Sequence, residues 1–313
     1  MKVKVFIDGS SGTTGLRIAD RLAERPEIEL LSISAEGRKD VHERAKVINS
    51  ADLAFLCLPD AASKEVMPLL RPDVKVLDTS TAFRTDAAWD YGFPELKGQK
   101  AKIQNSYRVA VPGCYASGFI SIARPLVELG LVPQSYPFSC TGISGYSGGG
   151  KKMIADYESP DRPAHSKLDA PKSYGLGLAH KHLPEMQKIS GLAHTPMFVP
   201  VVCDYYCGMQ VLVPLDLTLA GSTAEQVAEG IAAYYKDAAT VKVHALNEAL
   251  PENGLYSNAM AGTDRMELYM TVNAAGDQMM LVSLFDNLGK GSSGAAVQCM
   301  NLMLGFEETK GLE

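Results

Sequence analysis

The sequence predicts two domains: an α/β domain with a parallel sheet, followed by an α+β domain whose sheet is mostly antiparallel. Its 313 residues exceed the typical domain length of about 100 to 200 residues. Strand-like and helical segments alternate up to residue 113, as is typical of a parallel sheet covered by helices. Beyond residue 113, strand-like segments follow one another with few helices between them. This change of pattern separates the two domains.

The first predicted elements are a strand, a glycine-rich turn and a helix. Residues 3–8 are rich in β-branched and apolar side chains, residues 9–15 contain three glycines, and residues 16–22 have the spacing of an amphipathic helix. This order is typical of a Rossmann-type domain, whose turn and helix start bind a dinucleotide pyrophosphate through backbone N–H groups. The spacing G-x-x-G-x-x-G is only moderately specific, so a plain glycine turn is the alternative. The predicted cofactor contacts are Gly9, Ser11, Gly12, Thr13, Thr14 and Gly15.

The second strand, residues 28–34, indicates which dinucleotide is bound. It ends at Ser34, where an acidic residue would grip the ribose 2′-hydroxyl of NAD, and Arg38 and Lys39 follow. A hydroxyl and two cations suit a 2′-phosphate, so we predict NADP rather than NAD. A solvated pair of basic loop residues is the alternative.

Two further buried strands are predicted at residues 51–59 and 74–80, joined by a helix. Ligands of parallel sheets bind beyond the carboxyl ends of the strands, so Pro59 and Ser80 are predicted cofactor contacts. Arg84 follows closely, and its guanidinium can bind an anionic substrate group through two hydrogen bonds. An exposed arginine without such a role is the commoner case.

Cys114 stands where a turn meets a helix. Pro112 and Gly113 end the preceding strand, and the apolar pattern of a helix follows from residue 117. The N–H groups and positive dipole end of a helix favour the thiolate over the thiol. Cys114 is therefore a candidate nucleophile, with a buried, unreactive cysteine as the alternative.

The remainder of the chain predicts a β-rich domain. Helical patterns occur at residues 224–235 and 292–304, and the second of these is expected to return to the first domain. Runs of strands with segregated helices indicate an antiparallel α+β domain. The predicted strands cover residues 136–144, 197–202, 210–219, 266–273 and 278–284.

The predicted domain boundaries follow from these elements. The dinucleotide-binding domain spans residues 1–113 and is completed by a C-terminal helix in residues 290–313. Residues 114–289 form the catalytic and oligomerisation domain. A β-rich domain offers a self-complementary face, so we expect a homodimer or homotetramer.

A reactive thiol needs a proton partner, and one stretch of the chain has two histidines close to a carboxylate. His180, His182 and Glu185 lie within six residues of one another. The carboxylate can orient one imidazole. If the segment is extended, both rings point to the same face, so the sequence does not choose between them. A zinc site is disfavoured, because further ligands at suitable spacing are missing.

Composition narrows the classes of partner and the compartment. The formal charge is -6 and no long basic run occurs, which argues against nucleic acid or an anionic membrane as partner. No apolar run approaches the roughly 18 residues of a membrane span, and the N-terminal apolar stretch is short for a signal peptide. The six scattered cysteines fit free thiols in a reducing compartment rather than disulfides or a metal site. We therefore expect a cytoplasmic protein that binds a small molecule.

Six motifs in one order make the chain resemble the N-acetyl-gamma-glutamyl-phosphate reductase family, in its shorter type, nearly from end to end. They lie at Gly9–Gly15, Asp78–Arg84, Val111–Tyr115, Ser144–Gly148, His180–Glu185 and Asp286–Gly291.

The resemblance implies roles for individual residues. Cys114 matches the family's nucleophile, His180 its acid/base, and Asn287 and Lys290 the residues beside the nicotinamide of NADP. Lys151 stands in the glycine loop where an arginine is often expected, which puts its anion-binding role in doubt.

The chemistry so implied is reduction of N-acetyl-L-glutamyl 5-phosphate by NADPH to the 5-semialdehyde and phosphate, through a cysteine thioester, in arginine biosynthesis. N–H groups near Cys114 or Gly145 are candidate oxyanion donors. The predicted substrate contacts are Arg84, Gly145, Tyr174, His182 and Glu185, with Arg84, Lys151 and Tyr174 as holders of the phosphate or carboxylate.

Two other functions remain open from the sequence. Aspartate-semialdehyde dehydrogenases share this architecture and thioester chemistry but differ around the cysteine and histidine motifs. A nicotinamide-nucleotide-sensing protein, or a cysteine hydrolase that makes no redox use of its glycine loop, represents a different class.

Overall fold

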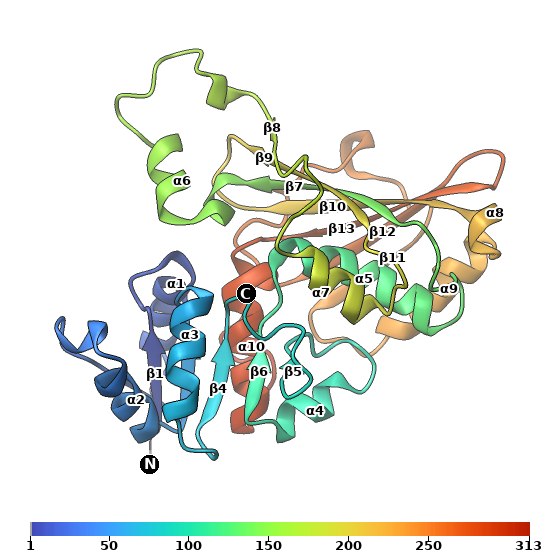
Figure 1. Cartoon of the computed structure of the whole chain (residues 1–313). Helices are drawn as coiled ribbons and strands as arrows, with labels where there is room; N and C mark the ends of the chain where they lie inside the picture. Colours follow the sequence, from blue (N-terminus) through green and yellow to red (C-terminus); the bar gives the residue numbers. More distant parts are fainter. Residues whose placement is uncertain (1) are drawn as a thin grey trace. The chain divides into compact units, whose positions relative to one another are not determined.

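The computed structural model describes residues 2–313 and divides them into two compact units. The first unit contains the residues up to Gly113 together with Ser292–Leu312. The second contains Cys114–Gly291 and Glu313. Figure 1 shows the chain coloured along its sequence, with the elements labelled.

The sheet of the first unit is parallel throughout, in the strand order β2-β1-β3-β4-β6-β5. This confirms the predicted α/β class. The strands are β1 (Val3–Asp8), β2 (Ile28–Leu31), β3 (Leu53–Leu56), β4 (Lys75–Asp78), β5 (Asp90–Tyr91) and β6 (Arg108–Ala110). The helices are α1 (Thr13–Ala23), α2 (Val41–Ser50), α3 (Asp60–Val66), α4 (Gln99–Asn105) and α10 (Gly294–Leu304).

Alternation along the strands builds a core on each face of this sheet. Val5 and Ile7 of β1 pack with α1 and α10 residues in one cluster, whereas Phe6 packs with α2 and α3 residues in the other. Because both faces are covered, the strands are apolar on both sides. Helix α10 is almost wholly buried in the first cluster, so the unit is completed by a segment far along the chain.

The sheet of the second unit has the strand order β11-β12-β13-β10-β7-β9-β8. The prediction of a mostly antiparallel sheet is wrong, because the sheet is mixed: β7 pairs with β9 and β11 with β12 in parallel. Parallel pairing needs a long crossover, and the segments between these strands are long enough to provide one. The strands are β7 (Ser139–Gly145), β8 (Lys172–Ser173), β9 (Met197–Cys203), β10 (Met209–Asp216), β11 (Val241–Leu246), β12 (Met266–Val272) and β13 (Gln278–Phe285).

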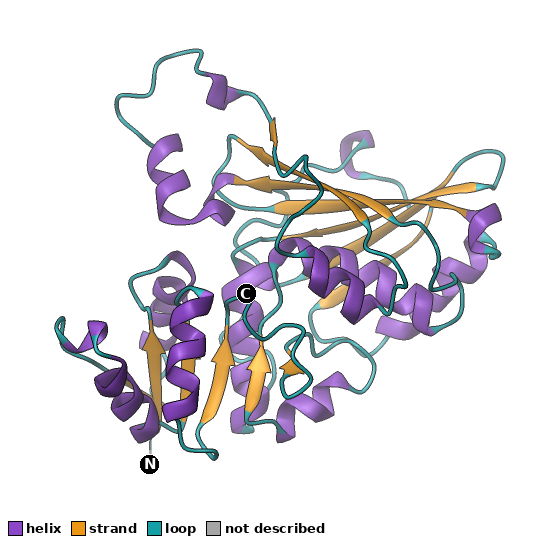
Figure 2. Ribbon diagram, in the orientation of Figure 1, coloured by secondary structure: helices purple, strands orange, loops and turns teal. Residues whose placement is uncertain are grey.

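Helices cover one face of this second sheet (Figure 2). Helix α5 (Cys114–Glu128) packs on β10 and β13 and is flanked by α7 (Leu183–Ser190) and α9 (Ala224–Tyr235). At Gly118 a Cβ atom would come within 2.5 Å of Val211 and 2.7 Å of Ser283, so glycine allows α5 to lie close to the sheet. The short helices α6 (Gly150–Tyr157) and α8 (Leu217–Ala220) complete the unit.

None of the helices within residues 2–313 has both the length and the apolar character needed to cross a membrane.

Candidate active site

Cys114 is the first residue of α5 in the second unit. The preceding strand β6 ends at Ala110, and three residues that include Pro112 and Gly113 make the turn. The thiol is half-buried and free of any disulfide. Its Cβ lies so close to Gly291 that a Cβ atom at Gly291 would stand only 2.9 Å away. The thiol therefore lies at the N-terminus of a helix, where backbone N–H groups are exposed, and Gly291 packs against its Cβ.

His180 lies against the residue that follows the thiol. Its ring meets the ring of Tyr115 edge-on, with 5.9 Å between centroids, and that of Phe198 at 5.2 Å. Burial, and to a lesser extent the charge of Lys181, lowers the pKa of His180 from 6.5 to about 4. The imidazole is therefore neutral at physiological pH.

A backbone hydrogen bond fixes the tautomer of His180. The N–H of His182 donates to His180 Nδ1 at 3.2 Å, so Nδ1 is an acceptor. A neutral imidazole that accepts at one nitrogen carries its proton on the other. His180 therefore presents an Nε2–H donor.

The sequence allowed an extended segment, in which both imidazoles would lie on the same face. The segment from His180 to Glu185 is not extended. His182 is the N-cap residue of α7, and Glu185 lies in the first turn of that helix. Both side chains are buried, whereas His180 is half-buried. The two imidazoles are nevertheless neighbours, 4.8 Å apart between ring centroids, and both contact Tyr115.

The glycine loop after β7 is held tightly by the turn between β9 and β10. A Cβ atom at Gly145 would lie 2.6 Å from the carbonyl oxygens of both Tyr205 and Tyr206, so no side chain fits there. The Gly145 N–H donates to the Gly208 carbonyl at 3.0 Å. It is thus already used within the fold, and our suggestion that it donates to an oxyanion is not supported by this geometry. Lys151, at the start of α6, is exposed.

Asn287 joins the same two segments through both ends of its amide. Its Nδ2 donates to Ser147 Oγ at 3.0 Å, and its Oδ1 accepts the Gly208 N–H at 2.8 Å. Asn287 and Lys290 are each only 2% exposed. Asn287 therefore links the glycine loop after β7 to the turn between β9 and β10.

Sequence reasoning missed Tyr115. Its ring fills the space over Gly142, where a Cβ atom would come within 2.4 Å of the ring, and its hydroxyl donates to the Val201 carbonyl at 3.2 Å. The hydroxyl of Tyr174, a predicted substrate contact, donates to that of Tyr115 at 3.4 Å. The available signal was the position of Tyr115 directly after the cysteine.

The first unit holds the predicted dinucleotide loop. Gly9 has a φ of +93°, and a Cβ atom there would lie 2.7 Å from the Cys57 carbonyl oxygen. At Gly15 a Cβ atom would lie 2.4 Å from the Gly9 carbonyl oxygen. Only glycine fits at these two positions, and α1 begins at Thr13 with its N–H groups at the loop.

A pocket of about 330 Å³ opens beside this loop. It is lined by Gly9, Ser10 and Ser11, by the end of β2 and the residues that follow it, and by Arg38. The hydroxyl of Ser34 accepts the Gly37 N–H at 3.0 Å and so supports the turn that carries Arg38 and Lys39, both exposed. A close glycine loop, a helix start and an arginine fit a dinucleotide that carries a 2′-phosphate.

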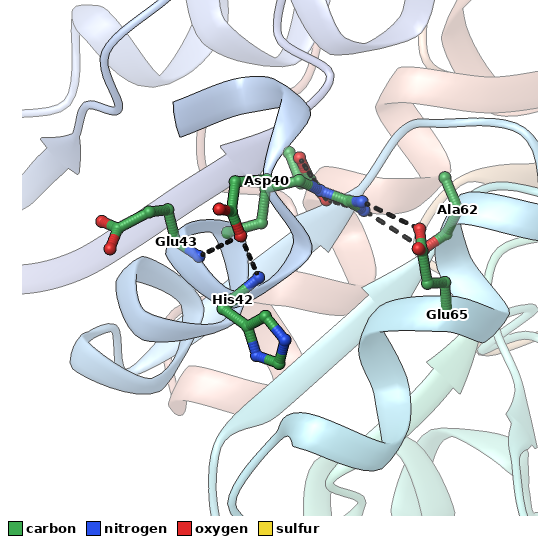
Figure 3. A network of polar contacts seen from close by, with 7 residues as sticks. Asp40, His42, Glu43, Ala62 and Glu65 are labelled. Atoms are coloured by element: carbon green, nitrogen blue, oxygen red, sulfur yellow. Dashed lines mark hydrogen bonds and ion pairs between the residues drawn. The ribbon is translucent and has the colours of Figure 1, made fainter. Parts of the chain in front are cut away.

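A buried ion pair that the sequence did not indicate lies at this pocket, because one of its members, Asp8, is a lining residue. The Arg44 guanidinium donates bidentate hydrogen bonds to the Asp8 carboxylate, the shortest at 2.7 Å, and both side chains are about 95% buried. It also reaches the Ala62 carbonyl and Glu65, while Asp40 caps α2 by accepting the N–H groups of His42 and Glu43 (Figure 3). The pair ties α2 and α3 to the strand that precedes the glycine loop.

The loop after β4 carries two more predicted contacts. Asp78 accepts hydrogen bonds from both the N–H and the hydroxyl of Ser80, and burial raises its pKa. Arg84 is buried and donates to the carbonyl oxygens of Val111 and Thr79, at 2.9 and 3.0 Å. Arg84 therefore braces the ends of β4 and β6, and is not the exposed side chain that the sequence allowed. Pro59, the N-cap residue of α3, is exposed.

Within residues 2–313 no cluster of three or more histidine, cysteine or acidic side chains has the arrangement needed to hold a metal ion.

Comparison with family models matches each part of the chain. Residues 4–104 match the semialdehyde dehydrogenase NAD binding domain, and residues 114–287 match the semialdehyde dehydrogenase dimerisation domain.

Curated relatives match over nearly the whole chain. The N-acetyl-gamma-glutamyl-phosphate reductase of Trichormus variabilis is 46% identical over 320 residues, which cover 99% of each chain. That of Burkholderia cenocepacia is 46% identical over 305 residues, covering 96% of this chain and 97% of the relative.

Solved structures of the same fold are more distant in sequence. Aspartate semialdehyde dehydrogenase II from Vibrio cholerae has a TM-score of 0.68 at 18% identity, covering 97% of this chain and 99% of that one. The aspartate semialdehyde dehydrogenase from Francisella tularensis has a TM-score of 0.70 at 15% identity, covering 96% of this chain and 100% of that one. These likenesses concern the fold alone, whereas the identity to the curated relatives shows that the chain belongs to the N-acetyl-gamma-glutamyl-phosphate reductase family.

Proposed function

We propose that this protein reduces N-acetyl-L-glutamyl 5-phosphate to N-acetyl-L-glutamate 5-semialdehyde with NADPH, releasing phosphate, as a step of arginine biosynthesis. The observation that carries the proposal is the thiol of Cys114 at the start of α5, with the neutral imidazole of His180 against the adjoining Tyr115. Membership of the reductase family supports the choice of substrate.

Cys114 forms the covalent bond with the substrate. Its sulfur attacks the acyl carbon, the bond from that carbon to the phosphate oxygen breaks, and phosphate leaves with the electron pair, so that a thioester remains. NADPH, when bound, supplies the hydride that reduces the thioester. The resulting hemithioacetal oxyanion re-forms a carbonyl as the carbon–sulfur bond breaks, which releases the semialdehyde and regenerates the thiolate.

His180 serves this chemistry as a hydrogen-bond donor. Its neutral ring holds the proton on Nε2, because Nδ1 accepts from the backbone. A neutral imidazole with a lowered pKa can polarise a carbonyl without giving its proton away. We propose that Nε2–H stabilises the oxygen of the acyl group as it gains negative charge. Acid/base transfer at the sulfur is the alternative role for the same ring.

The residues of the first unit are proposed to bind NADPH. Backbone N–H groups of Gly9–Gly15 would hold the pyrophosphate, and Arg38, Lys39 and Ser34 would hold the 2′-phosphate. Pro59 and Ser80 stand beyond the carboxyl ends of β3 and β4, where cofactors of such sheets bind. In the second unit, Asn287 and Lys290 are proposed to contact the nicotinamide end.

The substrate contacts that remain are proposals of the same kind. His182 is buried beside His180, Glu185 is buried in the first turn of α7, and we propose that they shape the substrate site with Gly145. The bonds of Arg84 to two carbonyl oxygens support an indirect role, in which it braces the strand end that leads to Cys114.

We also propose that the protein is a homodimer or homotetramer in the cytoplasm. The match of residues 114–287 to a dimerisation domain supports assembly. None of the six cysteines forms a disulfide, as suits a reducing compartment.

A spectrophotometric assay tests the proposed function. The purified protein should oxidise NADPH when N-acetyl-L-glutamyl 5-phosphate is added, and should do so more efficiently than with NADH. Preference for aspartyl phosphate would identify an aspartate-semialdehyde dehydrogenase instead. NADPH binding without any loss of absorbance would indicate a sensor, and release of phosphate without cofactor would indicate a hydrolase.

A further inference from the structure

Two tyrosine hydroxyls form a directional chain of hydrogen bonds in the second unit. The Tyr174 hydroxyl donates to the Tyr115 hydroxyl at 3.4 Å, and the Tyr115 hydroxyl donates to the Val201 carbonyl at 3.2 Å. Each phenol has only one proton to donate. Both protons are therefore used within the chain, and the Tyr174 oxygen faces any further partner as an acceptor.

The fold holds both phenols in place. Tyr115 packs over Gly142, where a Cβ atom would come within 2.4 Å of the ring, and α5 carries its backbone. Tyr174 directly follows β8, and its N–H donates to the Pro200 carbonyl at 3.1 Å. The acceptor therefore has a fixed position and a fixed polarity.

This acceptor lies beside the candidate catalytic groups. The Tyr174 ring meets the His180 ring edge-on, with 5.9 Å between centroids. The Tyr174 hydroxyl is also hydrogen-bonded to that of Tyr115, the residue that directly follows Cys114 at the start of α5. A substrate bound covalently to Cys114 would have its acyl chain within the same part of the unit.

The polarity of the chain argues against the role in phosphate or carboxylate binding that the sequence suggested for Tyr174. Phosphate, carboxylate and ester oxygens are acceptors, and two acceptors without a proton between them repel. The acetylamino group of the substrate has an N–H donor. Resting on the proposed function, we propose that the Tyr174 oxygen accepts the amide N–H of the N-acetylated substrate, and that this contact selects N-acylated substrates over analogues without the N–H.

A pair of substrates that differ only at this atom tests the proposal. The enzyme is assayed in the direction of semialdehyde oxidation, with NADP and inorganic phosphate, on N-acetylglutamate 5-semialdehyde and on the 2-acetoxy analogue, in which oxygen replaces the N–H. Tyr174→Phe should lower kcat/KM for the amide substrate by about tenfold, the usual effect of one neutral hydrogen bond, and should not lower it for the ester, whose repulsion by the Tyr174 oxygen is removed.

Tyr115→Phe provides a second variant with a different expectation. It removes the acceptor for the Tyr174 proton, so Tyr174 becomes able to donate to the ester oxygen, and the preference for the amide should shrink. Tyr234→Phe is the matched control, because its hydroxyl donates to Glu128 on α5 and its loss should leave the preference unchanged.

Three outcomes would overturn the inference. Equal losses on the two substrates in Tyr174→Phe would show a merely structural role, and no loss on either would show no role. A wild-type enzyme that fails to oxidise the amide substrate would overturn the proposed function together with this inference.

Discussion

Gly291 lies directly against Cys114, because a Cβ atom at Gly291 would stand 2.9 Å from the Cβ of Cys114 and 3.1 Å from the Asp286 carbonyl oxygen. Neither neighbour can move aside freely, since one is at the start of α5 and the other is backbone that accepts the Gly291 N–H at 2.9 Å. Gly291→Ala should therefore displace the thiol. Because a misplacement of about 1 Å can cost about 100-fold, we expect a loss of that order in kcat.

Turnover and the rate of Cys114 alkylation by iodoacetamide would both be measured for this variant. Gly254→Ala is the control, because no atom lies within 4 Å of the added Cβ and its φ is extended. An unchanged kcat in Gly291→Ala would show that the contact does not position the thiol.

Cys114→Ser should abolish reduction while leaving NADPH binding nearly intact. A serine hydroxyl is far less acidic than a thiol, so the nucleophile is lost, and turnover should fall by about 10⁴-fold or more. Absorbance at the nicotinamide band measures turnover, and fluorescence titration measures NADPH binding. Turnover retained by the serine variant would assign the chemistry to another residue.

His180→Ala should reduce kcat by about 10²-fold to 10³-fold, the loss expected for one oxyanion donor, and more than His182→Ala does, because only His180 presents a half-buried Nε2–H. The opposite order would transfer the role to His182.

The lowered pKa of His180 predicts the pH dependence. The acid limb of kcat should fall near pH 4, the pKa of the folded protein, rather than near 6.5. Between these values the unfolded chain binds a proton that the folded protein does not. Stability contributed at this site is therefore complete above about pH 6.5 and is lost as the pH falls toward 4. An acid limb at pH 6.5 in wild type would contradict the assignment.

Arg38→Ala should raise the KM for NADPH by about 10-fold to 100-fold, as expected for a lost hydrogen bond between charged groups, with little effect on NADH. The measurement is kcat/KM for each cofactor. Lys46→Ala, which removes an exposed lysine of α2 outside the pocket lining, is the control. An unchanged ratio between the cofactors would reject contact of Arg38 with the 2′-phosphate.

Arg44→Ala should destabilise the protein by about 3 to 5 kcal/mol, because it leaves the carboxylate of Asp8 buried without its partner. The double variant Asp8→Asn with Arg44→Met should lose less, since it leaves no isolated charge. Urea unfolding measures both. If the two variants were equally destabilised, the effect would come from packing rather than from the charge.

Local patterns predicted much of the fold. The helix at residues 224–235 was predicted with its observed ends, and the glycine turn at residues 9–15 was placed between the correct strand and helix. Both depend on signals within one segment, such as the Thr223 capping box and the apolar spacing of the helix.

What the sequence could not provide depends on segments far apart along the chain. A strand buried on one face has the same alternating sequence pattern whether its neighbour is parallel or antiparallel. The sequence therefore did not predict the mixed second sheet. The pairing of Arg44 with Asp8 spans 36 positions. The hydrogen bond from Tyr115 to Val201 spans 86. The tautomer of His180 depends on a turn at residues 180–182, and the sequence did not determine whether this segment is extended or turned.

The burial of α10 among the strands of the first unit has a consequence for biosynthesis. The ribosome releases this helix some 180 residues after β6, and until then one side of the parallel sheet is only partly covered, by residues of α1 and α4. The nascent first unit would thus expose apolar side chains to solvent and depend on chaperones, while the inserted β-rich unit can already fold. Truncations or stalled translation before residue 294 should yield aggregates rather than a smaller nucleotide-binding protein.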